Sequence, residues 1–210
     1  MGMTFKEYIK EAIKTNSEAS FLCENVKSKG IDETILHTIF GLNTEERELG
    51  QAYYELSDLM KHPGATEEDL KQKFLNIVEE LGDIFWYIAI AMHHLNVEPQ
   101  PSPDANPDVV MPAISEWLDK AKRTLFYGAD FDVEGFKQFL IDVEGAVEIL
   151  AKDIAGHDMP FDMSMIDKND PVGSVLEANV KKLRARYGEK FDSKKALERD
   201  IEQEYKAMEE

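Results

Sequence analysis

Hydrophobic residues recur at helical spacing in two long neighbouring segments of the chain. When successive residues are turned by 100°, the apolar positions from Ile31 to about Lys61 fall within a stripe about 60° wide. A second stripe of the same period runs from Thr66 to about Leu95. The two stripes are Ile35, Ile39, Leu42, Leu49, Tyr53, Leu56 and Met60, and Leu70, Phe74, Ile77, Leu81, Ile84, Ile88, Ala91 and Leu95. Because only the turn-forming Lys61-His62-Pro63-Gly64-Ala65 separates them, a long antiparallel helical hairpin is predicted over about 31–95.

The second of these helices contains an unusual apolar run. Nine consecutive apolar residues extend from Ile84 to Met92. This is far short of the roughly 20 residues that a membrane-spanning helix needs. Since the run is apolar on every side of a helix, we expect it to be buried all round. Glu79, Glu80 and Asp83 come directly before it, and buried charges are costly unless a metal, a proton or a partner compensates them.

The rest of the chain also has a helical pattern. Five prolines between 97 and 112 predict an extended linker there. No segment alternates like a strand, so the predicted fold class is all-α, a helical bundle in a single domain over 1–210. The other expected helices are about 4–12, after a capping box at Thr4, then about 113–127 and 133–155, which form a second hairpin, and the C-terminal helices at about 172–187 and 193–208. The segment 16–30 is less periodic and ends at Gly30.

A short internal echo links the two hairpins. Val78-Glu79-x3-Asp83-Ile84 resembles Val143-Glu144-x3-Glu148-Ile149, and each lies in the second helix of its hairpin. Helical repeats often look alike from periodicity alone. A diverged duplication and a coincidence of helical period both remain open.

The composition narrows the possible partners. The chain has 43% hydrophobic and 31% charged residues, which is typical of a soluble globular protein. Its net charge of −18 repels nucleic-acid polymers and anionic membranes, so neither is an expected partner. One cysteine, Cys23, and the lack of an apolar leader segment predict a reducing, cytoplasmic location.

Four carboxylates lie on the shoulders of the predicted hairpin seam. On helical wheels, Glu45 and Glu80 lie about 60° from the centre of their stripes, and Glu48 and Asp83 about 120°. Counting from Pro63, Glu48 is 15 residues back and Glu80 is 17 forward, while Glu45 and Asp83 are at 18 and 20. An antiparallel pairing therefore brings Glu48 level with Glu80, and Glu45 level with Asp83.

Converging carboxylates repel one another unless cations are bound. A purely oxygen ligand set suits Mg²⁺, or Mn²⁺, and offers no soft ligand for zinc or copper. A di-iron bundle would need Glu-x-x-His motifs, which these two helices lack. From wheel position alone, these side chains could equally be solvated shoulder residues that form ordinary surface pairs.

Three blocks of sequence together resemble a known superfamily. The first is Gly41-Leu42-x-x-Glu45-x-x-Glu48-Leu49, and the second is Glu79-Glu80-Leu81-Gly82-Asp83-Ile84-x-Trp86-Tyr87. The third is Asn179-x-x-Lys182-Leu183-x-x-Arg186-Tyr187-x-x-x-Phe191. In this order and spacing, the chain closely resembles the MazG-like all-α nucleoside triphosphate pyrophosphohydrolases, a superfamily that also holds the dimeric dUTPases and the phosphoribosyl-ATP pyrophosphohydrolases.

The resemblance implies an activity and roles for particular residues. The enzyme would hydrolyse an NTP or dNTP to the monophosphate and pyrophosphate. The alternative on the same fold is a phosphoribosyl-ATP-type pyrophosphohydrolase, which acts on a nucleotide derivative. By the resemblance, Glu45, Glu48, Glu80 and Asp83 would bind Mg²⁺. We expect one of these carboxylates, Glu48, to orient or deprotonate the attacking water. The residues implied to contact the triphosphate are Asn179, Lys182, Arg186 and Tyr187. The resemblance also favours a homodimer.

The chain departs from the family pattern in two places. The linker and second hairpin, about 97–171, separate the acidic blocks from the third block further than in compact members. The other departure lies between the first two glutamates. Glu46 and Arg47 stand where the family often has small residues, and Glu46 falls in the middle of the apolar stripe. Glu46 could be an extra ligand, could pair with a cation such as Arg47, or could mark a kink near Gly41. These departures leave open a non-catalytic helical binding or assembly protein. Glu79 and Trp86 share a helix face that is expected to turn away from the site.

Overall fold

The computed structural model describes residues 19–188, 194–195, 198 and 200–209, and every element in this part of the chain is a helix. The predicted all-α class is thus confirmed. The helices are α2 (Ala19–Ser28), α3 (Glu33–Leu59), α4 (Glu67–Leu95), α5 (Pro107–Tyr127), α6 (Val133–Gly156), α7 (Pro171–Tyr187) and α9 (Ile201–Glu209). Among the described residues, no helix combines the length and apolar character needed to cross a membrane.

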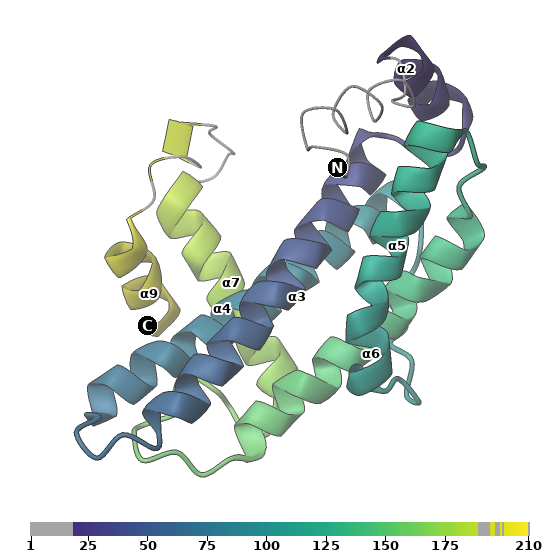
Figure 1. The fold of residues 1–210 in the computed structure, drawn as a ribbon. Helices are drawn as coiled ribbons and strands as arrows, with labels where there is room; N and C mark the ends of the chain where they lie inside the picture. The colour runs from purple at the N-terminus through teal and green to yellow at the C-terminus, as the bar shows by residue number, and fades with distance from the viewer. Residues whose placement is uncertain (1–18, 189–193, 196–197, 199, 210) are drawn as a thin grey trace, which may run out of the picture.

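The helices α3 and α4 form the predicted hairpin and run diagonally through the centre of the molecule (Figure 1). Asp32 caps α3 by accepting a hydrogen bond from the Ile35 N–H at 2.9 Å. Thr66 and Asp69 form a capping box at the start of α4, as their spacing predicts. These caps satisfy amide groups that the first helical turn leaves without partners, and so fix where each helix begins.

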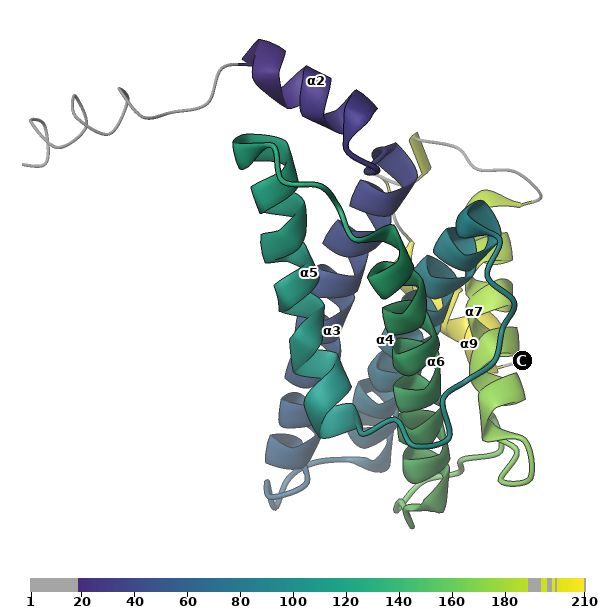
Figure 2. The ribbon, with the colours of Figure 1, turned by 90° about the vertical axis from the view of Figure 1, so that its right-hand side faces the viewer.

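The second hairpin, α5 and α6, packs beside the first (Figure 2). The predicted linker over 97–112 is wrong for residues 107–112, because α5 begins at Pro107 and continues through Pro112. Pro107 occupies the first turn, where its missing N–H costs no hydrogen bond. Pro112 is exposed, so the carbonyl that its ring displaces can turn to water, while Met111 and Ile114 anchor the helix in the core.

The helices α7 and α9 pack together on the other side of the central hairpin (Figure 1). The single helix predicted over about 193–208 is interrupted. Lys194 and Lys195 are helical, Glu198 and Asp200 are not, and α9 begins at Ile201. The helix expected over 4–12 lies outside the described residues. Within the less periodic segment 16–30, the structure places α2, and Gly30 follows it with a positive φ of 78°.

The helix α4 is the most enclosed element, since α3, α6 and α7 all pack against it. Its predicted stripe is buried, apart from the half-buried Leu95. The expectation that Ile84 to Met92 is buried all round is wrong on one side, where Trp86 and Ala89 are exposed. In the α3 stripe, Met60 is also exposed, because it follows the helix in the turn.

Candidate functional site

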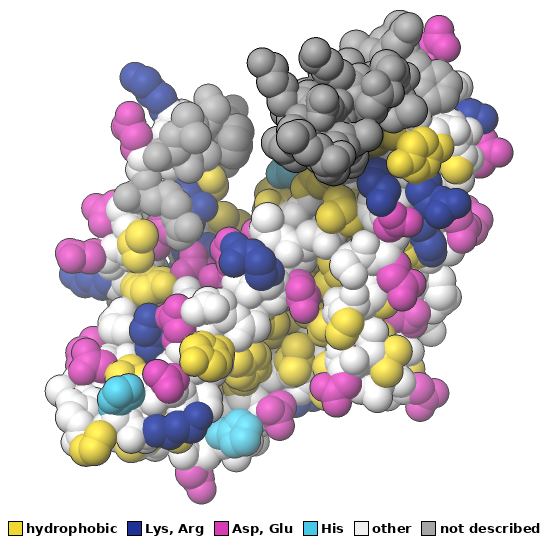
Figure 3. Space-filling model, in the orientation of Figure 1, with side chains coloured by type: hydrophobic (Ala, Val, Ile, Leu, Met, Phe, Trp, Pro, Cys, Tyr) yellow, Lys and Arg dark blue, Asp and Glu magenta, His cyan; other side chains and the backbone are white. Residues whose placement is uncertain are grey.

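Three carboxylates from the central hairpin converge at the crossing of α3 and α4. Carboxylate oxygens of Glu45, Glu48 and Glu80 all lie within 4.8 Å of one another. The predicted pairing of Glu48 with Glu80 across the hairpin is therefore present in the structure. We call these three residues the glutamate cluster. In Figure 3, acidic side chains lie in the hollow between the α7–α9 side of the molecule and α3.

The glutamate cluster carries charge that its surroundings do not solvate well. Burial raises the pKa of Glu80 to about 9, and a hydrogen bond with Glu45 and the charges of Glu79, Glu45 and Asp83 add to the rise. Burial also raises the pKa of Glu45, and the charge of Asp83 contributes. Without a cation, the Glu45–Glu80 pair therefore holds a shared proton. A hard divalent cation with water ligands suits this all-oxygen donor set and would take the place of that proton.

Lys182 of α7 reaches α4 beside the cluster and is completely buried. Its ammonium nitrogen lies 2.5 and 2.6 Å from the two carboxylate oxygens of Asp83. It also lies 3.3 Å from Oε1 of Glu79. Asn179, one turn earlier on α7, donates its amide N–H to Oδ1 of Asp83 at 2.7 Å. The structure thus brings Asp83 together with Asn179 and Lys182, and Asp83 faces these two residues.

The expectation that Glu79 turns away from the site is wrong. Its side chain is only 5% exposed and contacts Lys182. The helical wheel placed Glu79 on the face of α4 that points away from α3. That face is not open to solvent at this level, because α7 packs against it.

Arg186, the next residue of the third block, is also paired. Its Nε and Nη2 donate to the two oxygens of the buried Glu204, at 2.7 and 2.5 Å. The hydrogen bond with Glu204 raises the pKa of Arg186. This bidentate pair holds α9 against α7, and the Arg186 guanidinium also lies 5.6 Å from the centroid of the Tyr187 ring.

An aromatic cavity of about 370 Å³ opens on one side of the glutamate cluster. Besides the cluster, Glu79 and Asp83, it is lined by His37, Trp86, Tyr87, Leu183, Arg186 and Tyr187. The rings of His37, Trp86 and Tyr87 meet edge to face, with centroids 5.0 to 5.9 Å apart. Gly41 makes this arrangement possible, since a Cβ there would lie 2.1 Å from Cζ of Tyr87. Burial raises the pKa of Tyr87 to about 12, so its hydroxyl stays protonated at neutral pH.

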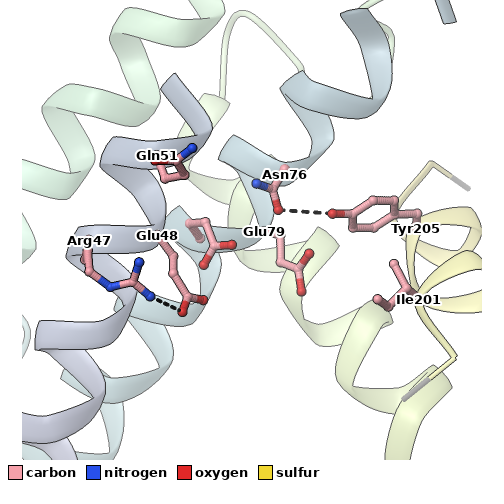
Figure 4. Close-up of a pocket in the computed structure, with 8 residues that line it drawn as sticks. Arg47, Glu48, Gln51, Asn76, Glu79, Ile201 and Tyr205 are labelled. Carbon is pink, nitrogen blue, oxygen red and sulfur yellow. Dashed lines mark hydrogen bonds and ion pairs between the residues drawn. The ribbon is translucent and has the colours of Figure 1, made fainter. Parts of the chain in front are cut away.

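A polar cavity of about 290 Å³ lies on the α9 side of the cluster and is lined by Glu48, Glu79 and Glu80 (Figure 4). The remaining lining residues are Arg47, Gln51, Asn76, Ile201 and Tyr205. The Tyr205 hydroxyl donates to Oδ1 of Asn76 at 3.1 Å. Asn76 is not among the site residues predicted from the sequence, although it precedes Glu80 by one helical turn and so shares its face. Nothing local could indicate Tyr205, which reaches the site from a distant helix.

The two residues that depart from the family pattern have different surroundings. Arg47 is 69% exposed and donates to Glu48 at 2.9 Å. Glu46 is half-buried, burial raises its pKa, and it forms no ion pair within the described part of the chain. Glu46 does not belong to the glutamate cluster. The ion-pair partner of Arg47 is Glu48 and not Glu46.

The matching positions of the second hairpin have structural partners. Glu144 accepts a hydrogen bond from the Gln100 N–H at 3.1 Å, and Glu148 pairs with Lys152 at 2.8 Å. A diverged repeat therefore stays a prediction.

Comparisons of the chain with protein-family models, with curated proteins and with solved structures give no match.

Proposed function

We propose that this protein is a Mg²⁺-dependent nucleoside triphosphate pyrophosphohydrolase, which converts an NTP or dNTP to the monophosphate and pyrophosphate. The observation that carries the proposal is the convergence of Glu45, Glu48 and Glu80 within 4.8 Å. These are three of the four carboxylates that the Glu-x-x-Glu and Glu-x-x-Asp blocks imply by their resemblance to MazG-like enzymes, and the fourth, Asp83, pairs with Lys182 beside them.

The metal's place in the proposal follows from the donor set. Glu45, Glu48 and Glu80 would hold the ion, with water completing its coordination. When bound, Mg²⁺ would screen the triphosphate, orient its oxygens and lower the pKa of a water. The proton shared by Glu45 and Glu80 would leave to solvent as the ion binds.

Glu48 is the best-placed general base in the cluster. Its side chain is 46% exposed and lines both cavities, so water can reach it. In the proposed reaction, Glu48 accepts a proton as water oxygen bonds to the α-phosphorus. The bond from the α-phosphorus to the bridging oxygen breaks, and its electron pair leaves on pyrophosphate.

The surroundings of the cluster suit the two ends of such a substrate. The aromatic cavity offers the faces and edges of Trp86 and His37 to a nucleobase. Arg47, in the polar cavity, can turn from Glu48 toward the departing pyrophosphate, because it is mostly exposed. The resemblance assigns this role to Lys182 and Arg186, but their cationic groups already pair with Asp83 and Glu204.

The test is pyrophosphate release from a panel of ribo- and deoxyribonucleoside triphosphates and phosphoribosyl-ATP, with Mg²⁺ present. We expect Glu80→Gln to lower kcat/KM by at least about 100-fold, because it removes a charged ligand from the cluster. Glu67→Gln, an exposed change on the same helix, is the matched control and should leave the rate unchanged. No turnover with any substrate, or full activity of Glu80→Gln, would refute the proposal.

A further inference from the structure

The aromatic cavity and the polar cavity meet at the glutamate cluster. Glu48, Glu79 and Glu80 line both of them, so a molecule bound at the cluster can extend into the two cavities at once. The aromatic cavity adds ring side chains to these carboxylates, whereas the polar cavity adds the N–H groups of Arg47 and Asn76. Rings suit a nucleobase, and N–H groups suit the oxygens of a diphosphate.

The side chain of Asn76 has one polar atom that is paired and one that faces the polar cavity. Its Oδ1 accepts a hydrogen bond from the Tyr205 hydroxyl at 3.1 Å. In Figure 4, its amide nitrogen points away from Tyr205, toward Gln51 of α3. Within the part of the chain that the structure describes, this nitrogen has no hydrogen-bond acceptor. Because Asn76 precedes Glu80 by four residues on α4, its N–H lies on the side of the glutamate cluster.

The Tyr205 hydroxyl is held in place by the packing of α9. Directly before Tyr205, the buried Glu204 forms its bidentate pair with Arg186 of α7. One turn after Tyr205, Glu209 pairs with Lys71 of α4 at 2.6 Å. These contacts attach α9 to both neighbouring helices, so the hydroxyl keeps its position at the wall of the polar cavity.

We infer that Asn76 binds the terminal diphosphate of the substrate through its amide N–H, and that Tyr205 is its positioning residue. The inference rests on the proposed function and assigns the polar cavity to the departing pyrophosphate. When the N–H donates to a phosphate oxygen, the Tyr205 hydroxyl satisfies Oδ1, so neither end of the amide lacks a partner. With the amide reversed, Oδ1 would face the phosphate, and two acceptors would repel each other.

The experiment measures the Kd of inorganic pyrophosphate for the full chain by isothermal titration calorimetry. Mg²⁺ is present throughout, because the carboxylates of the cavity wall repel a bare anion. Asn76→Leu keeps much of the side-chain volume but removes the N–H, and it should raise this Kd at least about 10-fold. Tyr205→Phe should raise the Kd about 3- to 10-fold. Adding Tyr205→Phe to Asn76→Leu should have no further effect, because Tyr205 acts through Asn76. The control Tyr54→Phe, at an exposed position of α3, should leave the Kd unchanged.

A second ligand separates a local effect from general damage to the site. The Kd values of the monophosphates from the nucleotide panel should stay within about twofold of wild type in both variants. Equal weakening of pyrophosphate and monophosphate would overturn the inference. Additive effects of the two substitutions would overturn the positioning role of Tyr205. If Asn76→Leu does not fold, Tyr205→Phe decides alone, and an unchanged Kd of pyrophosphate in that variant overturns the inference.

The remaining outcomes distinguish this inference from the proposed function. Hydrolysis by the wild type, together with an unchanged Kd of pyrophosphate in Asn76→Leu, would overturn the inference and leave the function standing. Pyrophosphate binding that depends on Asn76, in a chain that hydrolyses no nucleotide, would support the N–H donor and refute the hydrolysis. No binding of pyrophosphate by the wild type would overturn the inference, and the nucleotide panel then tests the function separately.

Discussion

Replacing Lys182 by methionine removes the charge that neutralises Asp83 and Glu79 but keeps much of the side-chain volume. The Lys182 side chain is 0% exposed, against 5% for Glu79 and 23% for Asp83, so solvent cannot take over its role. Breaking a buried ion pair on one side costs about 3–5 kcal/mol, because the other charge stays buried and loses that counter-charge. For a chain of this size, that corresponds to a fall in Tm of roughly 6–20 °C.

The assay is urea unfolding at pH 7 in metal-free buffer, with Lys181→Met as the matched control. Lys181 forms no ion pair among the described residues, and its replacement should change the free energy of unfolding by less than about 0.5 kcal/mol. Adding Asp83→Asn to Lys182→Met should restore part of the loss, as expected for two residues in direct contact. A loss below about 1 kcal/mol in Lys182→Met, or strict additivity in the double variant, would contradict the assigned pairing.

Two further predictions concern the cluster and its aromatic wall. Burial raises the pKa of Glu80 from 4.5 to about 9, so between these values the folded chain keeps a proton that the unfolded chain loses. In the absence of metal, the free energy of unfolding should therefore fall by a few kcal/mol from about pH 5 to pH 9. Thermal unfolding should show that added Mg²⁺ and Glu80→Gln each reduce this dependence of stability on pH. An unchanged pH dependence in either case would show that Glu80 is not its cause. Gly41→Ala should lower the free energy of unfolding by about 1–3 kcal/mol in chemical denaturation, because its Cβ would overlap Tyr87. Gly50 lies on the same helix with open space around it, so Gly50→Ala should instead raise the free energy of unfolding by about 0.5–1 kcal/mol. Equal effects of the two alanines would rule out the tight packing at Gly41.

The central hairpin and its glutamates could be predicted from sequence because they depend on local period and on one short turn. Helical spacing gives the buried faces of α3 and α4, and the count from Pro63 gives the level at which Glu48 meets Glu80. The surroundings of Glu79 and the partner of Asp83 could not be predicted in this way. Both depend on how α7 packs on α4 across about a hundred residues of sequence, which a helical wheel of one helix does not contain.

The predicted start of α5 is wrong for a different reason. Five prolines over 97–112 indicate a linker, but proline is favoured in the first turn of a helix and is tolerated on a solvent-facing side. The polar cavity likewise needs Tyr205 of α9 beside Asn76 of α4, a contact that depends on tertiary packing alone.

The most direct measurement of the central claim is hydrolysis of a nucleoside triphosphate in ¹⁸O-labelled water with Mg²⁺, followed by ³¹P nuclear magnetic resonance. If water attacks the α-phosphorus beside Glu45, Glu48 and Glu80, the label will appear in the nucleoside monophosphate, and the pyrophosphate will be unlabelled. Label in the pyrophosphate, release of orthophosphate with a nucleoside diphosphate, or no hydrolysis at all would contradict the account.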